Sequence, residues 1–210
     1  MNLSDDRRLL VEQVIKSFET SIDVKRKCIG GGCADIVVEM AQCVAEAISR
    51  GGKLLLCGNG GSAADAQHLA AELVVRLRPH VSREGVAAMS LAMDSSTLTA
   101  CGNDFAFDEI FSRPLQSMGR SGDVLLGITT SGNSVNVVRA FKCAQAMGIH
   151  ALGFLGNGGG SALQHCDMAL VVPSDDTAAI QEAHITAGHA LMVLVEDLLL
   201  RDGHISRMEG

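Results

Sequence analysis

Two polar patterns in this sequence combine residue types that bind metals or move protons. His68 and Glu72 are four residues apart in an alanine-rich stretch without proline, so they share one face of a predicted helix. A later, mainly apolar stretch carries four more polar residues: Gln181, Glu182, His184 and His189. Polar side chains are costly to bury, so their presence in such a stretch suggests a function. Two histidines, a glutamate and a glutamine from two helices match a zinc site with an open position. The alternative for His68 and Glu72 is an exposed polar pair.

The spacing along the second of these helices constrains such a site. Gln181 and His189 are eight residues apart, roughly 12 Å of rise and about 80° around a straight helix. Both side chains reach one ion with difficulty if they come from the same chain. Either Gln181 lies in a frayed first turn or a second subunit completes the site. We favour the second arrangement, which predicts an oligomer.

Two turns offer donors for an anion. The first, C-G-N-G-G-S at 57–62, joins an apolar strand at 54–57 to the helix of His68, with Ser62 as the expected N-cap. Free N–H groups and the positive helix end converge there, which suits a phosphate. The second, T-T-S-G-N-S, supplies four hydroxyls before another helix: Thr129, Thr130, Ser131 and Ser134. Phosphate binding is the favoured interpretation, and ordinary helix capping is the alternative.

Two further glycine-rich patterns are not interpreted as ligand sites. The first turn lacks the last glycine of G-x-G-x-x-G, because Ala63 takes its place, and this disfavours a dinucleotide site. A third turn, G-N-G-G-G-S at 156–161, is interpreted as structural.

The elements that position these residues alternate between strand and helix. Strands are expected at 54–57, 85–91, 123–128, 150–155 and 168–172, and helices at 4–28, 34–50, 63–77, 109–118, 135–147 and 178–201, with a loop-rich segment at 94–108. This order predicts one α/β domain with an open parallel sheet, whose ligands lie beyond the carboxyl ends of the strands. The first helix carries Leu10, Val14, Phe18 and Ile22 on one stripe, which predicts contact with a partner subunit.

Composition limits the remaining classes. The 210 residues carry a formal charge of −7, and the pI is about 5.4, so no basic surface for nucleic acid or an acidic membrane is expected. No signal-like segment or long apolar run occurs, which predicts a cytoplasmic protein. The seven cysteines form no C-x-x-C pair and are expected to be small buried residues.

Together these motifs make the sequence closely resemble the phosphoheptose isomerases of the sugar-isomerase (SIS) domain superfamily over nearly the whole chain. The resemblance is carried by C-G-N-G-G-S…D-A-x-H-x-A-x-E-L at 57–73, C-G-N-D-F-x-F at 101–107, F-S-R at 111–113, G-D-V-L-L-G-I-x-T-S-G-N-S at 122–134 and I-Q-E-x-H-I…H at 180–189. Three departures are Thr129 in place of the common serine, Ala63 and Ala64 in place of bulkier residues, and Ala179 in place of arginine.

The resemblance implies a flavodoxin-like three-layer sheet. We expect 51–210 to form the SIS domain that binds the sugar phosphate, and 1–50 to be a helical segment of the same domain that serves oligomerisation. It implies a homotetramer with active sites at subunit interfaces and one zinc ion per subunit, bound by His68, Glu72, Gln181 and His189. It assigns substrate binding to Asn59, Gly60, Gly61, Ser62, Glu72, Asn103, Asp104, Thr129, Thr130, Ser131, Ser134 and Gln181.

The implied activity converts sedoheptulose 7-phosphate to D-glycero-D-manno-heptose 7-phosphate through an enediol, the first step toward ADP-heptose and the lipopolysaccharide core. In our hypothesis Glu72 is the base and His189 the acid, and a tight bond from Glu72 to zinc would weaken the base. The alternative is a non-catalytic SIS protein that associates with the replication initiator. Such proteins lack the acid/base set, which this chain keeps at Glu72, Gln181 and His189.

Overall fold

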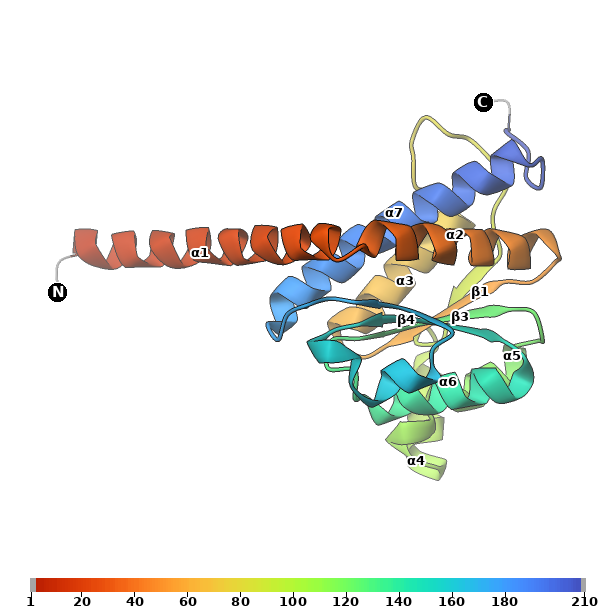
Figure 1. Cartoon of the computed structure of the whole chain (residues 1–210). Coiled ribbons are helices and arrows are strands. Elements are labelled where there is room, and N and C mark those ends of the chain that lie inside the picture. Colours follow the sequence, from red (N-terminus) through yellow and green to blue (C-terminus); the bar gives the residue numbers. More distant parts are fainter. Residues whose placement is uncertain (1–2, 209–210) are drawn as a thin grey trace.

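The structure is a computed structural model that describes residues 3–208. It contains a five-stranded parallel sheet flanked by helices on both faces (Figure 1). The helices are α1 (Leu3–Gly30), α2 (Cys33–Ser49), α3 (Gly61–Val74), α4 (Ser95–Asp104), α5 (Ser112–Met118), α6 (Val135–Met147) and α7 (Thr177–Arg201), with 3₁₀ segments η1 (Phe107–Glu109) and η2 (Asn157–His165). The strands are β1 (Leu54–Gly58), β2 (Ala88–Ser90), β3 (Val124–Thr129), β4 (His150–Leu155) and β5 (Met168–Val171).

The sheet is buried on both faces because its strands are apolar at successive positions. Leu54 and Leu56 of β1 face a core shared with α2, α3 and α7, whereas Leu55 and Cys57 face a second core shared with α5 and α6. Continuous apolar runs of this kind are typical of parallel strands covered on both sides. The predicted three-layer α/β class is therefore confirmed.

The strand order places two turns next to each other. The order is β2-β1-β3-β4-β5, and Gly58 at the end of β1 pairs with Ile128 near the end of β3. The chain leaves β1 toward one edge of the sheet and β3 toward the other, which is the flavodoxin-like switch point where ligands of such sheets bind. The glycine turn and the hydroxyl-rich turn both lie at this point.

Helix α7 is the central helix of the layer that carries the candidate ligands. It is long and apolar enough to satisfy the length and composition of a membrane span, but residues such as Leu191, Val195 and Leu199 pack in the core with the sheet. Gly188 lies directly against Leu69 of α3, and a Cβ atom at Gly188 would come within 2.6 Å of that side chain. The missing side chain lets α3 and α7 approach closely at the level of His68 and His189.

Several local predictions were wrong. Ser62 is not the N-cap of α3: Gly60 takes that position with a φ of 55°, so Ser62 falls inside the first turn and is buried. The segment at 94–108 is not mainly loop, because Asp94 caps α4 by accepting from the N–H of Ser96. Helix α3 ends at Val74 rather than near residue 77, and β2 is shorter than predicted.

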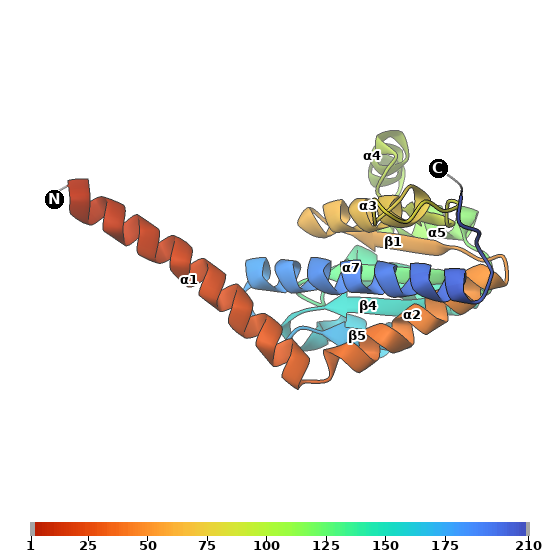
Figure 2. The same cartoon turned by 90° about the horizontal axis from the view of Figure 1, so that it is seen from above.

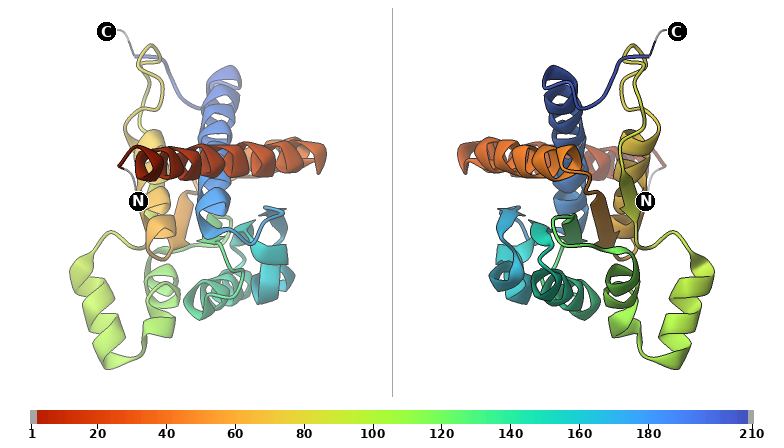
Figure 3. Two further views of the ribbon diagram at one scale, coloured as in Figure 1. Left: turned by 90° about the vertical axis from the view of Figure 1, so that its left-hand side faces the viewer. Right: turned by 90° about the vertical axis from the view of Figure 1, so that its right-hand side faces the viewer.

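Two elements extend from the body of the molecule. The N-terminal part of α1 projects beyond the sheet and its helices (Figure 2). The stripe of Leu10, Val14, Phe18 and Ile22 is between 46% and 69% exposed. Helix α4 also lies outside the three layers (Figure 3), and its flanking residue Phe105 is exposed and lies under the guanidinium of Arg113.

The close contact between α3 and α7 makes a prediction about stability. An alanine at Gly188 gains about 1 kcal/mol of helix propensity but overpacks a fully buried Leu69 at a cost of about 1–3 kcal/mol. We expect Gly188→Ala to lower the free energy of unfolding in urea. Gly102→Ala in α4 is the matched control, because no atom lies within 4 Å of its new Cβ, and it should raise that free energy. Equal effects of the two substitutions would contradict the packing argument.

Candidate functional site

Three potential ligand atoms converge between α3 and α7. The Nε2 atoms of His68 and His189 are 2.8 Å apart, and Nε2 of His68 lies 3.2 Å from Oε1 of Glu72. The ligand atoms of these three residues all lie within 4.8 Å of one another. The four-residue spacing on α3 presents His68 and Glu72 on one face, and α7 brings His189 opposite them. One chain therefore assembles the two proposed proton carriers, Glu72 and His189.

The donor set fits a divalent cation. Two imidazole nitrogens and one carboxylate oxygen match catalytic zinc sites, which keep a further position open, and two ligands of a tetrahedral zinc ion lie about 3.3 Å apart. Asp65, one turn before His68, has a buried carboxylate oxygen without a hydrogen-bond partner among the described residues. Burial raises the pKa of Asp65, and the nearby His68 and His189 oppose this rise. The unpaired carboxylate of Asp65 would stabilise a cation bound by the cluster.

The other polar residues of α7 do not join the cluster. The amide of Gln181 packs against Gly61, so closely that a Cβ at Gly61 would lie 2.4 Å from its Nε2. Gln181 is in the second turn of α7, not in a frayed first turn. Glu182 binds Ser21 and Lys25 of α1 and so joins two helices.

The hydroxyl-rich turn does not serve mainly to cap α6. Ser134 occupies the N-cap position, yet its side chain accepts no hydrogen bond from the helix. Its hydroxyl instead lies 2.9 Å from that of Thr129, which is 3.4 Å from Oγ of Ser131. The capping alternative is wrong for Ser134, and the three hydroxyls form one group beside the N-terminus of α6. Thr130 lies between them and is half-buried.

A pair of side-chain amides joins the two turns. Asn59 after β1 and Asn136 in α6 exchange two hydrogen bonds of 2.8 and 2.9 Å. Asn136 also accepts from the main-chain N–H of Val137. The sequence interpretation missed Asn136, although it follows the T-T-S-G-N-S motif by only two residues. This pair fixes the distance between the glycine turn and the hydroxyl group.

The third glycine turn supports the second, as predicted. A Cβ at Gly132 would lie 2.3 Å from the main chain of Gly159, so only glycine permits this approach. Ala162 donates its N–H to the Gly132 carbonyl at 2.8 Å, and Ser161 donates to the side chain of Asn133.

The glycine turn keeps donors available. Ser62 donates to the Asn59 carbonyl and Ala63 to that of Gly60. Within residues 3–208 no acceptor is found for the main-chain N–H groups of Gly60, the N-cap of α3, and Gly61, its first residue. A helix N-terminus with free N–H groups suits an anion.

Asn103 and Asp104 stand apart from these turns. Both are exposed at the end of α4, and the one side-chain hydrogen bond found for either in the described part of the chain joins Asn103 to Asp104. Among the described residues, no hydrogen bond joins these two implied substrate contacts to the glycine turn or to the hydroxyl-rich turn.

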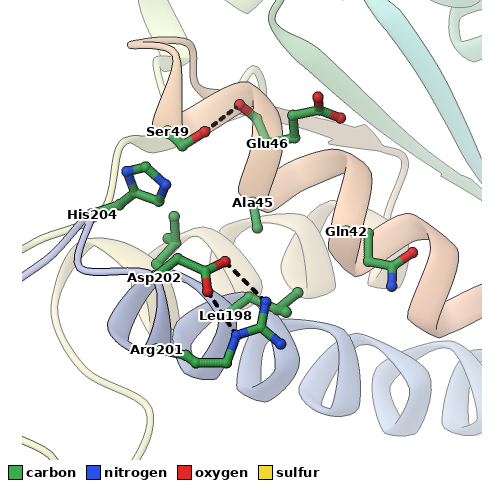
Figure 4. A pocket seen from close by; sticks show the side chains of 9 residues that line it. Gln42, Ala45, Glu46, Ser49, Leu198, Arg201, Asp202 and His204 are labelled. Atoms are coloured by element: carbon green, nitrogen blue, oxygen red, sulfur yellow. Dashed lines mark hydrogen bonds and ion pairs between the residues drawn. The ribbon is translucent and has the colours of Figure 1, made fainter.

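A hollow of about 300 Å³ lies elsewhere, between α2 and the end of α7. Figure 4 shows two interactions among its polar groups: Arg201 pairs with Asp202, and Ser49 donates to the Glu46 carbonyl. Arg201 is twelve residues beyond His189, about 18 Å along the helix. This hollow is separate from the candidate site.

Comparisons with known proteins identify the family. The SIS domain family model matches residues 33–156. The chain is 48% identical to the phosphoheptose isomerase of Roseiflexus sp. over 189 residues, which cover 90% of this chain and 94% of that protein. The corresponding protein of Paramagnetospirillum magneticum is 54% identical over 75% of this chain and 81% of its own length. This chain belongs to the phosphoheptose isomerase family.

A solved structure agrees with this assignment. The phosphoheptose isomerase of Neisseria gonorrhoeae superposes with a TM-score of 0.84 at 40% identity, over 90% of this chain and 99% of that one. Membership of the phosphoheptose isomerase family confirms the predicted resemblance, the SIS fold and the enzyme class, and it does not favour the non-catalytic alternative.

His184 gives a prediction about pH. Its ring is fully buried, stacks on Phe154 with centroids 5.8 Å apart, and has no hydrogen-bond partner of normal geometry among the described residues. Burial lowers the pKa of His184 to about 4, although the main chain of Leu155 opposes the shift in part. Because an unfolded histidine titrates near 6.5, the unfolded chain binds the proton first, and stability falls as the pH drops from about 6.5 to 4, by about 3 kcal/mol in all.

We expect His184→Leu to remove most of this pH dependence. The measurement is the free energy of unfolding in urea at pH 7.5 and at pH 4.5. The exposed His80 provides a control, since His80→Leu should keep the wild-type difference between the two conditions. An unchanged difference in His184→Leu would exclude His184 as the source.

Proposed function

We propose that this protein interconverts sedoheptulose 7-phosphate and D-glycero-D-manno-heptose 7-phosphate through an enediol. The observation that carries the proposal is the meeting of Glu72 and His189 between α3 and α7, in a chain of this family. Two turns with free donors at the starts of α3 and α6 support it. An aldose–ketose isomerisation needs a base at carbon, an acid at oxygen and a grip on the phosphate.

The two turns at the switch point would hold the sugar phosphate. The N–H groups of Gly60 and Gly61 and the hydroxyls of Thr129, Ser131 and Ser134 supply donors at two helix N-termini. Other contacts to phosphate or sugar hydroxyls are proposed for Asn59, Ser62, Thr130, Glu72 and Gln181. His68 lies seven residues beyond Gly61, about 10 Å along α3. An extended seven-carbon sugar phosphate is long enough to reach from the turns to the cluster.

Glu72 and His189 would carry the protons. Glu72 takes a proton from C1 of the ketose while the C1–C2 double bond forms and His189 gives a proton to O2. His189 then takes the proton from O1 as the C1 carbonyl forms, and Glu72 returns its proton to C2. Each group ends in its starting protonation state, so the cycle is balanced.

The cluster would also hold a zinc ion. His68, Glu72 and His189 supply three ligands, and Gln181, which lies against Gly61 in its own chain, would reach an ion from a neighbouring subunit. A bound ion polarises the substrate carbonyl and stabilises the developing oxyanion. Glu72 can act as a base only if its bond to such an ion is loose.

The active form would be a homotetramer in the cytoplasm that serves lipopolysaccharide heptose synthesis. The exposed stripe of α1 supports assembly, since a long unpaired apolar face needs a partner. We propose that 1–50 forms the contact between subunits and that Asn103 and Asp104 complete the site of a neighbouring chain. No role for nucleic acid or membrane is proposed for a chain with a net charge of −7.

The direct test is isomerase activity on sedoheptulose 7-phosphate. We expect Glu72→Gln and His189→Gln each to lower kcat by about 100-fold or more, because each removes a proton carrier. His204→Gln, at an exposed histidine outside the cluster, should keep wild-type kcat. The proposed mechanism fails if all three variants and the wild type have the same activity.

The metal proposal is tested by elemental analysis of purified protein. We expect about one zinc ion per subunit in the wild type and less than about a tenth of that in His68→Ala, since loss of one of three ligands opens the site. The surface variant His80→Ala controls for nonspecific binding and should match the wild type. Equal zinc content in His68→Ala and wild type would remove His68 as a ligand.

A further inference from the structure

A buried arginine binds the end of α3. Arg83 follows this helix in the sequence, and its side chain is 0% exposed. The guanidinium donates to the main-chain carbonyl of Glu72 at 2.8 Å and to that of Leu73 at 2.7 Å. These carbonyls belong to the last turn of α3, where helix geometry leaves acceptors without partners and a positive charge is favoured.

The opposing charge comes from α7. Glu196 is 1% exposed, and its Oε1 lies 3.4 Å from Nε of Arg83. It is seven residues beyond His189, two helical turns along the same face. A continuous set of contacts therefore runs from the main chain of Glu72 through Arg83 and Glu196 to the helix that carries His189.

The main chain of Arg83 is fixed from a third side. Arg83 forms an isolated antiparallel bridge with Arg207, and Met208 donates to the Ser82 carbonyl at 3.1 Å. Leu73 already receives a hydrogen bond from the N–H of Val86, so capping α3 alone does not require Arg83. Arg83 also donates to the carbonyl of its neighbour Glu84 at 2.9 Å. Of the two α3 carbonyls that Arg83 binds, only that of Glu72 receives no other main-chain donor among the described residues.

We propose that Arg83 and Glu196 form a strut that sets the position of the Glu72 carboxylate relative to His189. They are positioning residues, because neither belongs to the cluster that would meet the substrate. The proposal rests on the proposed function, in which Glu72 and His189 carry the protons. Stability alone is a weak reason for such a pair, since a buried ion pair often contributes no more than apolar residues of similar size.

The experiment compares kcat, KM and melting temperature in Arg83→Lys, Glu196→Gln and a matched control. Lysine keeps the charge but cannot bridge two carbonyls and a carboxylate. We expect both strut variants to lower kcat by about 10- to 100-fold, as loss of supporting contacts does. KM should stay within about threefold, because the phosphate turns lie at the other end of α3. Asp202→Asn is the control, because the exposed Asp202 pairs with Arg201 and no hydrogen bond or ion pair among the described residues joins either of them to Arg83 or Glu196.

A folded Arg83→Lys protein with kcat within twofold of wild type overturns the strut. If the single variants do not fold, the double variant Arg83→Met/Glu196→Leu removes both charges. A folded double variant with wild-type kcat also overturns the strut, and a folded double variant with reduced kcat supports it. An inactive wild type instead overturns the proposed function. The strut is then tested by Co²⁺ titration followed by visible absorption. Weaker Co²⁺ binding in Arg83→Lys than in Asp202→Asn supports the strut, and equal binding overturns it.

Discussion

The reactive geometry depends on the register in which α3 packs against α7. Gln181 lies against Gly61 and Gly188 against Leu69, so the two helices run in the same direction with matched residues along their length. His189 follows Gly188 and therefore faces His68, while Glu72 lies one turn farther along α3. A shift of one residue in either helix would turn a ligand through about 100° and separate the cluster.

If this acidic protein binds a sugar phosphate, as proposed, the donors lie at the other end of α3. A net charge of −7 gives no general attraction for a phosphate, so the donors must be local. Hydroxyls and free N–H groups at two helix N-termini provide them, and the Asn59–Asn136 amide pair keeps the two turns together. On the proposed function, α3 carries the phosphate donors at one end and the proton-transfer group Glu72 toward the other, so one rigid helix sets the distance between them.

The sequence predicted what depends on local patterns. Apolar runs bounded by glycine or hydroxyl turns located the five strands, and the bounds of α6 and β4 were predicted without error. The four-residue spacing of His68 and Glu72 indicated a shared face. Contacts between distant segments left no such pattern: Arg83 and Glu196 are 113 residues apart, and nothing in the sequence around Arg83 marks it as buried. Ser62 was misplaced because a glycine with positive φ started the helix earlier than a serine cap would.

A single chain leaves the site open. The side chain of His68 is 49% exposed, and an enediol needs protection from water. The same chain leaves the α1 stripe, Phe105 and Phe107 exposed, and Asn103 is exposed at the end of α4, outside the three layers (Figure 3). If the protein has the proposed function, one explanation covers both the open site and the exposed apolar surfaces. A neighbouring subunit that covers the apolar surfaces would also exclude water from the cluster, so assembly and catalysis would depend on the same contacts.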